Sequence, residues 1–120
     1  MVIVMNVVQV SEGREEDFER AFRERERLLD QAPGFRGFEL LRPRPDEALS
    51  AHGASHPDDG APVLAGSYIV VTRWETAEHF HGWVRSDLFR RAHRGRESGV
   101  AAANSVHMYE VIETEEPAVA

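Results

Sequence analysis

Three residues are candidates for chemistry because of their types and positions: Asn6, Trp83 and His93. Asn6 interrupts a run of apolar residues, and a buried amide requires hydrogen-bond partners. Trp83 lies near the end of a predicted helix, and His93 lies among arginines. Each residue also has an ordinary structural interpretation: a core amide bonded to backbone or water, a core tryptophan, and a surface or helix-capping histidine.

The spacing of Trp83 and His93 favours a shared site only if the helix between them is broken. The two residues are ten positions apart, and on one straight helix at ~100° per residue their side chains would point roughly 80° apart. A break at Ser86 and Asp87 would let both side chains point into one cavity. We therefore expect two short helices in this region.

The sequence has no cysteine and six histidines. Disulfides, thiolate metal sites and thiol nucleophiles are thus excluded, whereas histidine and carboxylate chemistry stays open. His52 and His56 are four positions apart, but Pro57 follows them and no helical pattern surrounds them. We do not expect a metal site there.

The net charge of −7 argues against affinity for nucleic acid or an anionic membrane, because both would repel the molecule. Residues 85–96 are nevertheless positive, with five arginines against the single acid Asp87. This segment could attract a small anionic ligand, or it could be a solvated helix face.

Length and composition predict one globular domain. The chain has 120 residues, of which 42% are hydrophobic and 29% charged, as in ordinary folded domains. No window reaches the ~18 to 20 apolar residues of a membrane span, and the N-terminus lacks the features of a signal peptide. We therefore expect a cytoplasmic protein.

Apolar periodicity predicts four strands and three helical segments. Strands are expected over residues 2–10, 35–42, 67–74 and 105–113, and helices over residues 14–32, 77–85 and 86–94. Thr76 is a suitable N-cap for the second helix. Residues 1–114 form the expected domain, with a long flexible loop at 43–66, either a lid or disordered, and a frayed acidic tail at 115–120.

The order β-α-β-β-α-β predicts an α+β, ferredoxin-like fold, with an antiparallel four-stranded sheet and helices on one face. Both side-chain rows of the strand at 2–10 are apolar, which a sheet with one face in water would not tolerate. We therefore expect a homodimer that packs sheet against sheet, in the manner of a dimeric α/β barrel.

Three segments carry a family resemblance: PGFRGFELLRP (33–43), YIVVTRWETAEHFHGW (68–83) and SDLFRRAH (86–93). Together with the strand that holds Asn6, they resemble the IsdG-type haem-degrading monooxygenases of the antibiotic-biosynthesis-monooxygenase (ABM) superfamily. The resemblance covers nearly the whole chain apart from residues 43–66 and the tail. The Asn, Trp and His set is its most specific part.

The resemblance implies a role for each of five residues. Asn6 matches the family's distal asparagine, Trp83 the tryptophan that presses on the macrocycle, and His93 the proximal ligand of the haem iron. Phe22 and Arg25 fall where the first helix of the family lines the pocket and meets a haem propionate.

The chemistry of these residue types agrees with those roles. A neutral imidazole is a common axial ligand of haem iron, and the arginines around His93 would attract the propionates. Asn6 can donate a hydrogen bond to dioxygen at the iron without itself titrating. The sequence has no flavin or nicotinamide motif, so ring opening and iron release would require an external electron donor, such as a separate reductase.

Two other functions remain open at this stage. The same fold supports cofactor-independent, quinone-forming monooxygenases, which need no iron ligand at position 93. A haem-binding dimer without turnover would use His93 for binding alone. Function therefore has to be decided from the site and not from the fold.

Overall fold

The structure is a computed structural model in which residues 1–44, 64, 66–94 and 99–118 are described. The order of elements is the predicted β-α-β-β-α-β, with the second helical region divided in two. The strands are β1 (Val2–Val10), β2 (Phe35–Leu41), β3 (Tyr68–Trp74) and β4 (Ala101–Glu110). The helices are α1 (Glu15–Arg23), the 3-10 turn η1 (Leu29–Gln31), α2 (Ala77–Val84) and α3 (Asp87–Ala92).

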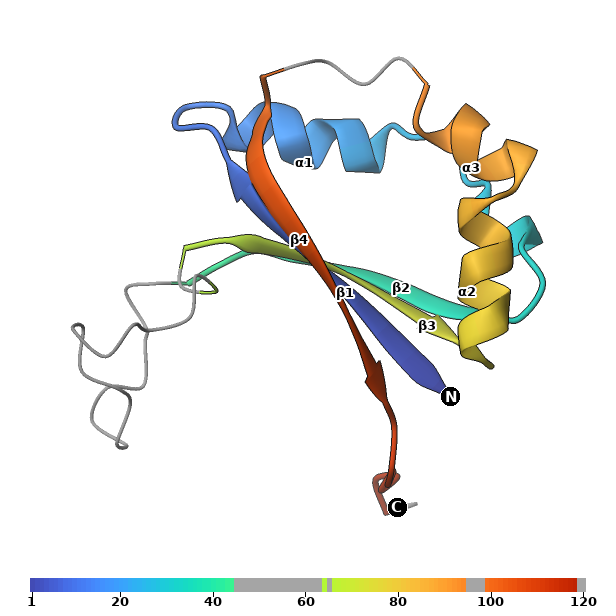
Figure 1. Ribbon diagram of the computed structural model, residues 1–120. Helices are drawn as coiled ribbons and strands as arrows, with labels where there is room; N and C mark the ends of the chain where they lie inside the picture. Colours follow the sequence, from blue (N-terminus) through green and yellow to red (C-terminus); the bar gives the residue numbers. More distant parts are fainter. Residues whose placement is uncertain (45–63, 65, 95–98, 119–120) are drawn as a thin grey trace.

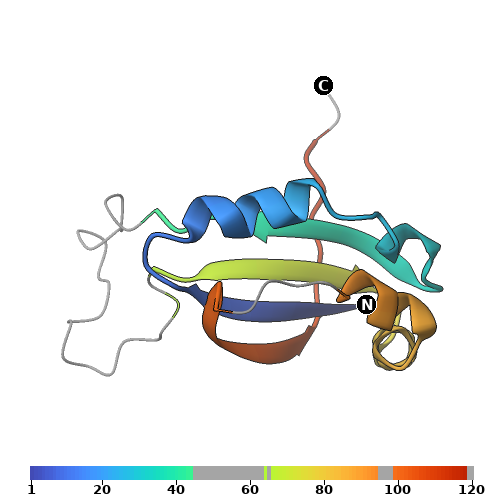
Figure 2. The same cartoon turned by 90° about the horizontal axis from the view of Figure 1, so that it is seen from above.

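The four strands form one antiparallel sheet in the order β2-β3-β1-β4. The helices lie along one side of this sheet, and the opposite side carries none among the described residues (Figures 1 and 2). The prediction of an α+β, ferredoxin-like fold is confirmed. No helix in the described part of the chain is long and apolar enough to cross a membrane.

Side chains between the sheet and the helices form two core clusters. One contains Trp74, which is fully buried, together with Val4, Leu28, Ala32 and Trp83. The other joins β1, α1 and β3 through buried residues that include Val8, Phe18 and Tyr68. The even-numbered row of β1, which contains Val4 and Val8, therefore faces the helices.

The predicted helix over residues 14–32 is wrong in its second half. Helix α1 ends at Arg23, and the chain then turns before η1. The Arg25 side chain donates from Nη1 to the Phe22 carbonyl oxygen over 2.7 Å, which satisfies a carbonyl at the helix end. The turn brings Leu28, only 3% exposed, against Trp74 and Trp83. Burial of this leucine thus outweighs the weak local preference for helix.

The predicted strand over residues 105–113 is displaced. Strand β4 begins at Ala101 and ends at Glu110, and residues 111–118 form neither helix nor strand. The alanines at its start pair with the end of β1, where the register shifts between Gln9 and Val10. Their position is fixed by backbone pairing and not by side-chain preference. Most of the predicted 43–66 loop, including His52 and His56, lies outside the described residues.

The side of the sheet away from the helices is apolar at its centre. Met5 pairs with Val71, and Val7 pairs with Ile69, so their side chains share this face. Val7 and Val71 are buried even in the single chain, and Leu41 at the neighbouring strand is 42% exposed. An uncovered apolar face of this kind is typical of an interface.

Candidate active site

A cavity of about 530 Å³ lies between the sheet and the helices. Its walls come from all four strands, from α1, from the segment between α1 and η1, and from η1, α2 and α3. Most of the lining side chains are aliphatic or aromatic, and the few polar groups include Asn6, Arg25, Thr72 and His93. Such a mainly apolar pocket with a few polar groups, within the ~300–1,000 Å³ range, is typical of a site for a bulky organic ligand.

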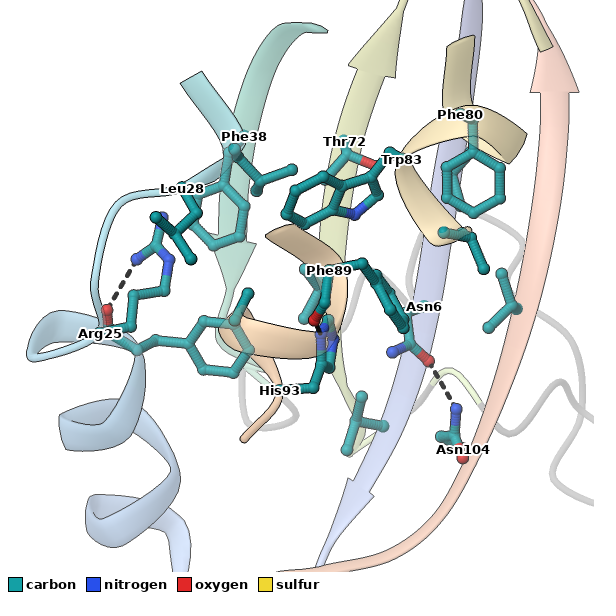
Figure 3. Close-up of a pocket in the computed structure, with 18 of the residues that line it drawn as sticks. Asn6, Arg25, Leu28, Phe38, Thr72, Phe80, Trp83, Phe89, His93 and Asn104 are labelled. Carbon is teal, nitrogen blue, oxygen red and sulfur yellow. Dashed lines mark hydrogen bonds between the residues drawn. The ribbon is translucent and has the colours of Figure 1, made fainter. Parts of the chain in front are cut away.

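The five predicted site residues all line this cavity, although they come from four different elements or their flanks. Asn6 lies on β1, Trp83 on α2 and His93 directly after α3, while Phe22 and Arg25 lie at and just beyond the end of α1. Figure 3 shows Arg25 on one side of the cavity, Asn6 on the other, and His93 and Trp83 between them. The structure therefore brings together residues that are up to 87 positions apart in the sequence.

His93 is held in a defined orientation at the C-terminal end of α3. Its ring nitrogen Nδ1 lies 2.8 Å from the carbonyl oxygen of Phe89, an acceptor, so Nδ1 carries a proton and donates. In the neutral imidazole the lone pair is then on Nε2. The ring also lies 3.9 Å, centroid to centroid, from the ring of Phe89. This tautomer is the one that suits a metal ligand at Nε2.

Trp83 belongs both to the core and to the cavity wall. It is 7% exposed, and its ring centroid lies 6.3 Å from that of Trp74 and 5.7 Å from that of Phe89. The predicted helix break lies directly after it: α2 ends at Val84, and α3 begins after Ser86, whose Oγ accepts from the Phe89 amide at 3.1 Å. The break gives Trp83 and His93 access to the same space.

Asn6 is half-buried on β1 and has a side-chain partner on β4. Its Oδ1 accepts a hydrogen bond from Nδ2 of Asn104 at 3.1 Å. The two amides share the helix-facing side of the sheet, because Val8 is the register partner of Asn104 and Val106 is that of Asn6. The amide of Asn6 is thus satisfied at its oxygen by a side chain and not by backbone.

Arg25 supplies a cation at the edge of the cavity. Its guanidinium lies 4.2 Å from the ring centroid of Phe38 and 5.9 Å from that of Phe22. Burial lowers the pKa of Arg25, and the nearby charge of Arg27 lowers it further. One of its N–H groups is used by the Phe22 carbonyl oxygen, and a guanidinium has four more donors.

The basic segment after α2 is less positive than the sequence suggests. Arg91 forms an ion pair with Glu26, and Arg90 forms one with Asp87. A second cavity of about 480 Å³ extends between α1 and α3, shares Phe22 and Arg25 among its lining residues with the first, and is also lined by Arg91 and Arg94. The lining of this second cavity contains four arginines, at positions 20, 25, 91 and 94, and three acids, Asp17, Glu24 and Glu26, so its charge is positive by a small excess only.

A partly buried carboxylate, that of Glu19, anchors α1 to the sheet. Glu19, whose side chain is 13% exposed, accepts from Nε of Arg42 at 2.7 Å, from a second nitrogen of Arg42 and from the hydroxyl of Tyr68. Hydrogen bonds from Arg42 and then from Tyr68 lower the pKa of Glu19 from its ordinary value of 4.5 to about 2. The carboxylate thus joins the end of β2 and the start of β3 to the helix that carries Phe22.

Sequence reasoning missed several residues of the site. Asn104 falls outside the predicted strand at 105–113 but lies on β4 and lines the cavity. Leu28, Phe38 and Phe89 also line the cavity, and none of them was assigned to the site from the sequence. The polar Asn104 in an otherwise small and apolar stretch was the one available signal.

The family can be identified by comparison with known proteins. A family model described as "Antibiotic biosynthesis monooxygenase" matches residues 1–50 and 64–95. The chain belongs to this family. The predicted resemblance to the ABM superfamily is confirmed, as is the expectation of an IsdG-type enzyme.

Several ABM proteins similar to this chain have names that state a reaction with haem. A "Heme oxygenase (mycobilin-producing)" of Mycobacterium tuberculosis is 31% identical over 112 residues, which cover 92% of this chain and 89% of that protein. A "Heme-degrading monooxygenase" of Shouchella clausii is 26% identical over 113 residues, 92% of this chain and 90% of that protein. A solved structure of the heme-degrader MhuD from M. tuberculosis, with two hemes bound in its active site, is also similar to this chain. The two structures align with a TM-score of 0.73 and 27% sequence identity, over 97% of this chain and 100% of the MhuD chain.

Proposed function

We propose that this ABM protein is a haem-degrading monooxygenase whose substrate binds in the cavity between the sheet and the helices. The observation that carries the proposal is the arrangement of that cavity. A histidine with its lone pair on Nε2 lines the helix side, an amide lines the sheet side, and the walls between them are largely aromatic and aliphatic. The relatives that degrade haem support the choice of substrate.

We assign His93 as the axial ligand of the haem iron. The Phe89 carbonyl oxygen fixes the tautomer and orientation of the imidazole, as outer hydrogen bonds do for metal-binding histidines. When bound, the haem supplies an iron centre that reacts with dioxygen and with electrons delivered from outside.

Asn6 and Trp83 act on the substrate from the other walls. The amide of Asn6 faces the cavity from β1 and donates a hydrogen bond on the face of the ring away from His93. Trp83 is rigid because Trp74 packs behind it, so it resists a flat macrocycle and favours a distorted one. When haem is bound, Trp83 would contact the ring and Asn6 would offer a hydrogen-bond donor beside it.

The charged edge of the site orients the substrate. Arg25 lies over Phe38 at the boundary of the two cavities, and Arg91 and Arg94 line the second cavity. Propionate groups of haem are anionic and pair well with guanidinium groups. The apolar ring thus enters the first cavity beside Phe22, and its carboxylates remain on the α1–α3 side.

The complete reaction requires dioxygen and an external electron donor, and it releases iron as the ring opens. A separate reductase or a small reductant supplies the electrons, because the sequence carries no nucleotide-cofactor motif.

The active form is a homodimer. The face that contains Met5, Val7, Ile69 and Val71 carries no helix in the described structure, and a second copy would remove it from water. Light scattering at micromolar concentration should give twice the chain mass of 13.5 kDa. A particle of single-chain mass would contradict this assembly.

The decisive experiment titrates the protein with haemin and then adds reductant in air. The wild type should show a Soret band of histidine-ligated haem, and this band should decay after reductant is added. His93→Ala should lose tight haem binding, and no haem decay should follow. His81 is the other histidine that lines the cavity among the described residues, and His81→Ala should keep the histidine-ligated band.

Three outcomes would contradict parts of this proposal. If the wild type causes no shift of the Soret band of haemin, haem is ruled out as the substrate. A stable band under reductant and oxygen would indicate a haem-binding protein without turnover. Loss of the histidine band in His81→Ala and its retention in His93→Ala would reassign the ligand.

A further inference from the structure

The indole N–H groups of the two tryptophans in the chain have different surroundings. Trp74 is fully buried, and its Nε1 donates to Oγ1 of Thr72 at 2.9 Å. Trp83 is only 7% exposed, yet its Nε1 has no acceptor among the described residues. Because a buried indole N–H normally has a hydrogen-bond partner, the open donor of Trp83 points to a ligand.

The open N–H of Trp83 is accessible from the cavity. No side-chain nitrogen or oxygen in the described part of the chain is both fully buried and without a partner, so Nε1 of Trp83 is not sealed in the core. The cavity is the space that Trp83 lines, and in Figure 3 the indole nitrogen lies on the side of the ring toward Phe89 and Asn6. An indole nitrogen only donates. Since Trp83 packs against Trp74 and Phe89, the donor is held in place.

Haem itself offers this donor no acceptor. Its pyrrole nitrogens bind the iron, and in the proposed orientation its carboxylates lie on the α1–α3 side, whereas Trp83 lines the first of the two cavities and not the second. Oxidative opening of the ring adds oxygen to ring carbons, and an open tetrapyrrole carries carbonyl oxygens, which accept hydrogen bonds. A donor that gains its partner only after oxygen is added stabilises later states of the reaction and not the bound substrate.

We propose that Trp83 is a hydrogen-bond donor as well as a packing surface, and that its indole N–H binds an oxygen atom at the edge of the oxidised tetrapyrrole. This inference rests on the proposed function. It gives the site a preference for a ring-opened, carbonyl-bearing tetrapyrrole that the packing of Trp83 alone would not give.

Replacement of each tryptophan by naphthylalanine at an amber codon separates the N–H from the packing, because naphthylalanine has a bicyclic ring of similar size and no N–H. Trp83→naphthylalanine removes no hydrogen bond between described residues, so its stability in urea should stay close to that of the wild type. Trp74→naphthylalanine removes the bond to Thr72 and should be less stable. Trp74 does not line the cavity, so this variant is the matched control.

The affinities for biliverdin and haemin measure the donor. Biliverdin is an open tetrapyrrole with a carbonyl oxygen at each end, and the ring of haemin has none. Loss of one neutral hydrogen bond should weaken biliverdin binding by Trp83→naphthylalanine about three- to tenfold, while haemin binding should change less than about twofold. In Trp74→naphthylalanine the ratio of the two affinities should equal that of the wild type.

Hydrogen exchange of the indole N–H groups in the wild type gives a readout that depends on no variant. The N–H of Trp83 should exchange with solvent faster than that of Trp74 in the protein without ligand. Binding of biliverdin should slow the exchange at Trp83 and leave that at Trp74 unchanged. Exchange at Trp83 that biliverdin does not slow would overturn the inference.

Several other results would overturn the donor role and leave haem binding intact. These are an unchanged biliverdin affinity in Trp83→naphthylalanine, an equal loss of biliverdin and haemin affinity in that variant, and a changed affinity ratio in Trp74→naphthylalanine. A wild type that binds haemin and not biliverdin would overturn it as well. A wild type that binds neither ligand would remove the proposed function, and the donor role of Trp83 with it.

Discussion

The link between Glu19, Arg42 and Tyr68 makes a quantitative prediction about stability and pH. Glu19→Gln replaces the carboxylate by an amide of nearly the same shape, so it removes the charge and leaves the packing. The pKa of Glu19 is about 2 in the folded protein and would return to about its ordinary value of 4.5 on unfolding. Because the folded-state value is the lower one, the stabilisation is present above about pH 4.5 and is lost as the pH falls toward 2.

The size of the effect follows from these two pKa values. The difference between the two pKa values corresponds to a contribution of at most about 3.4 kcal/mol to the free energy of unfolding at neutral pH. The Glu19 side chain is 13% exposed, but that of Arg42 is 66% exposed, so solvent screens part of the attraction. We therefore expect Glu19→Gln to lower the free energy of unfolding by about 1–2 kcal/mol at pH 7, and by less than half of that amount at pH 3.

Urea unfolding followed by tryptophan fluorescence is a suitable assay, because Trp74 is fully buried in the folded state. The wild type and the variant are compared at pH 7 and pH 3 at one protein concentration. Glu24→Gln is the matched control: its side chain is 70% exposed and lies 4.0 Å from Arg20, so its effect should stay below about 0.5 kcal/mol at both pH values. A difference between wild type and Glu19→Gln that is the same at pH 7 and pH 3 would refute this reasoning.

Three further substitutions test the site and its support. Asn6→Ala should keep the Soret band of the haem complex but slow haem decay about 10²–10³-fold, by analogy with the loss of an oxyanion-hole donor worth ~2.7–4 kcal/mol; unchanged decay would make Asn6 a structural amide only. Trp83→Phe should bind haem and retain partial turnover, at a stability cost below the ~3–5 kcal/mol of a change to Ala, as measured by haem decay and urea unfolding. Gly34→Ala should destabilise the protein by about 2 kcal/mol or more in urea unfolding, because Gly34 has φ +77° and an added Cβ would clash with the His79 ring.

Local patterns predicted much of the fold and part of the site. The alternation of side chains along β1 puts Asn6 on the same row as Val4 and Val8, and in the structure that row faces the helices and the cavity. Both predicted helix starts after β3 are present, since the hydroxyl oxygens of Thr76 and Ser86 accept from backbone amides three residues later. Capping and periodicity depend on residues within a few positions of each other, so the sequence alone carries this information.

The sequence alone could not place the ends of α1 and β4. Residues 24–32 continue a helical apolar pattern, yet the helix ends at Arg23 because Leu28 gains more by burial against Trp74 and Trp83. The alanines that open β4 have little strand preference, and they become a strand because β1 offers backbone partners.

The sequence by itself determined the order of the elements and which residues share one row of β1, because both follow from residues that are close together in the chain. Tertiary structure decided which distant side chains meet: Asn104 with Asn6, Arg42 and Tyr68 with Glu19, and Arg91 with Glu26. These partners are 23 to 98 positions apart. A hydrogen bond depends on the distance and angle between two groups in space. The number of residues between the two partners does not determine that distance or that angle. Both are set only when the register of the sheet and the ends of the helices are fixed.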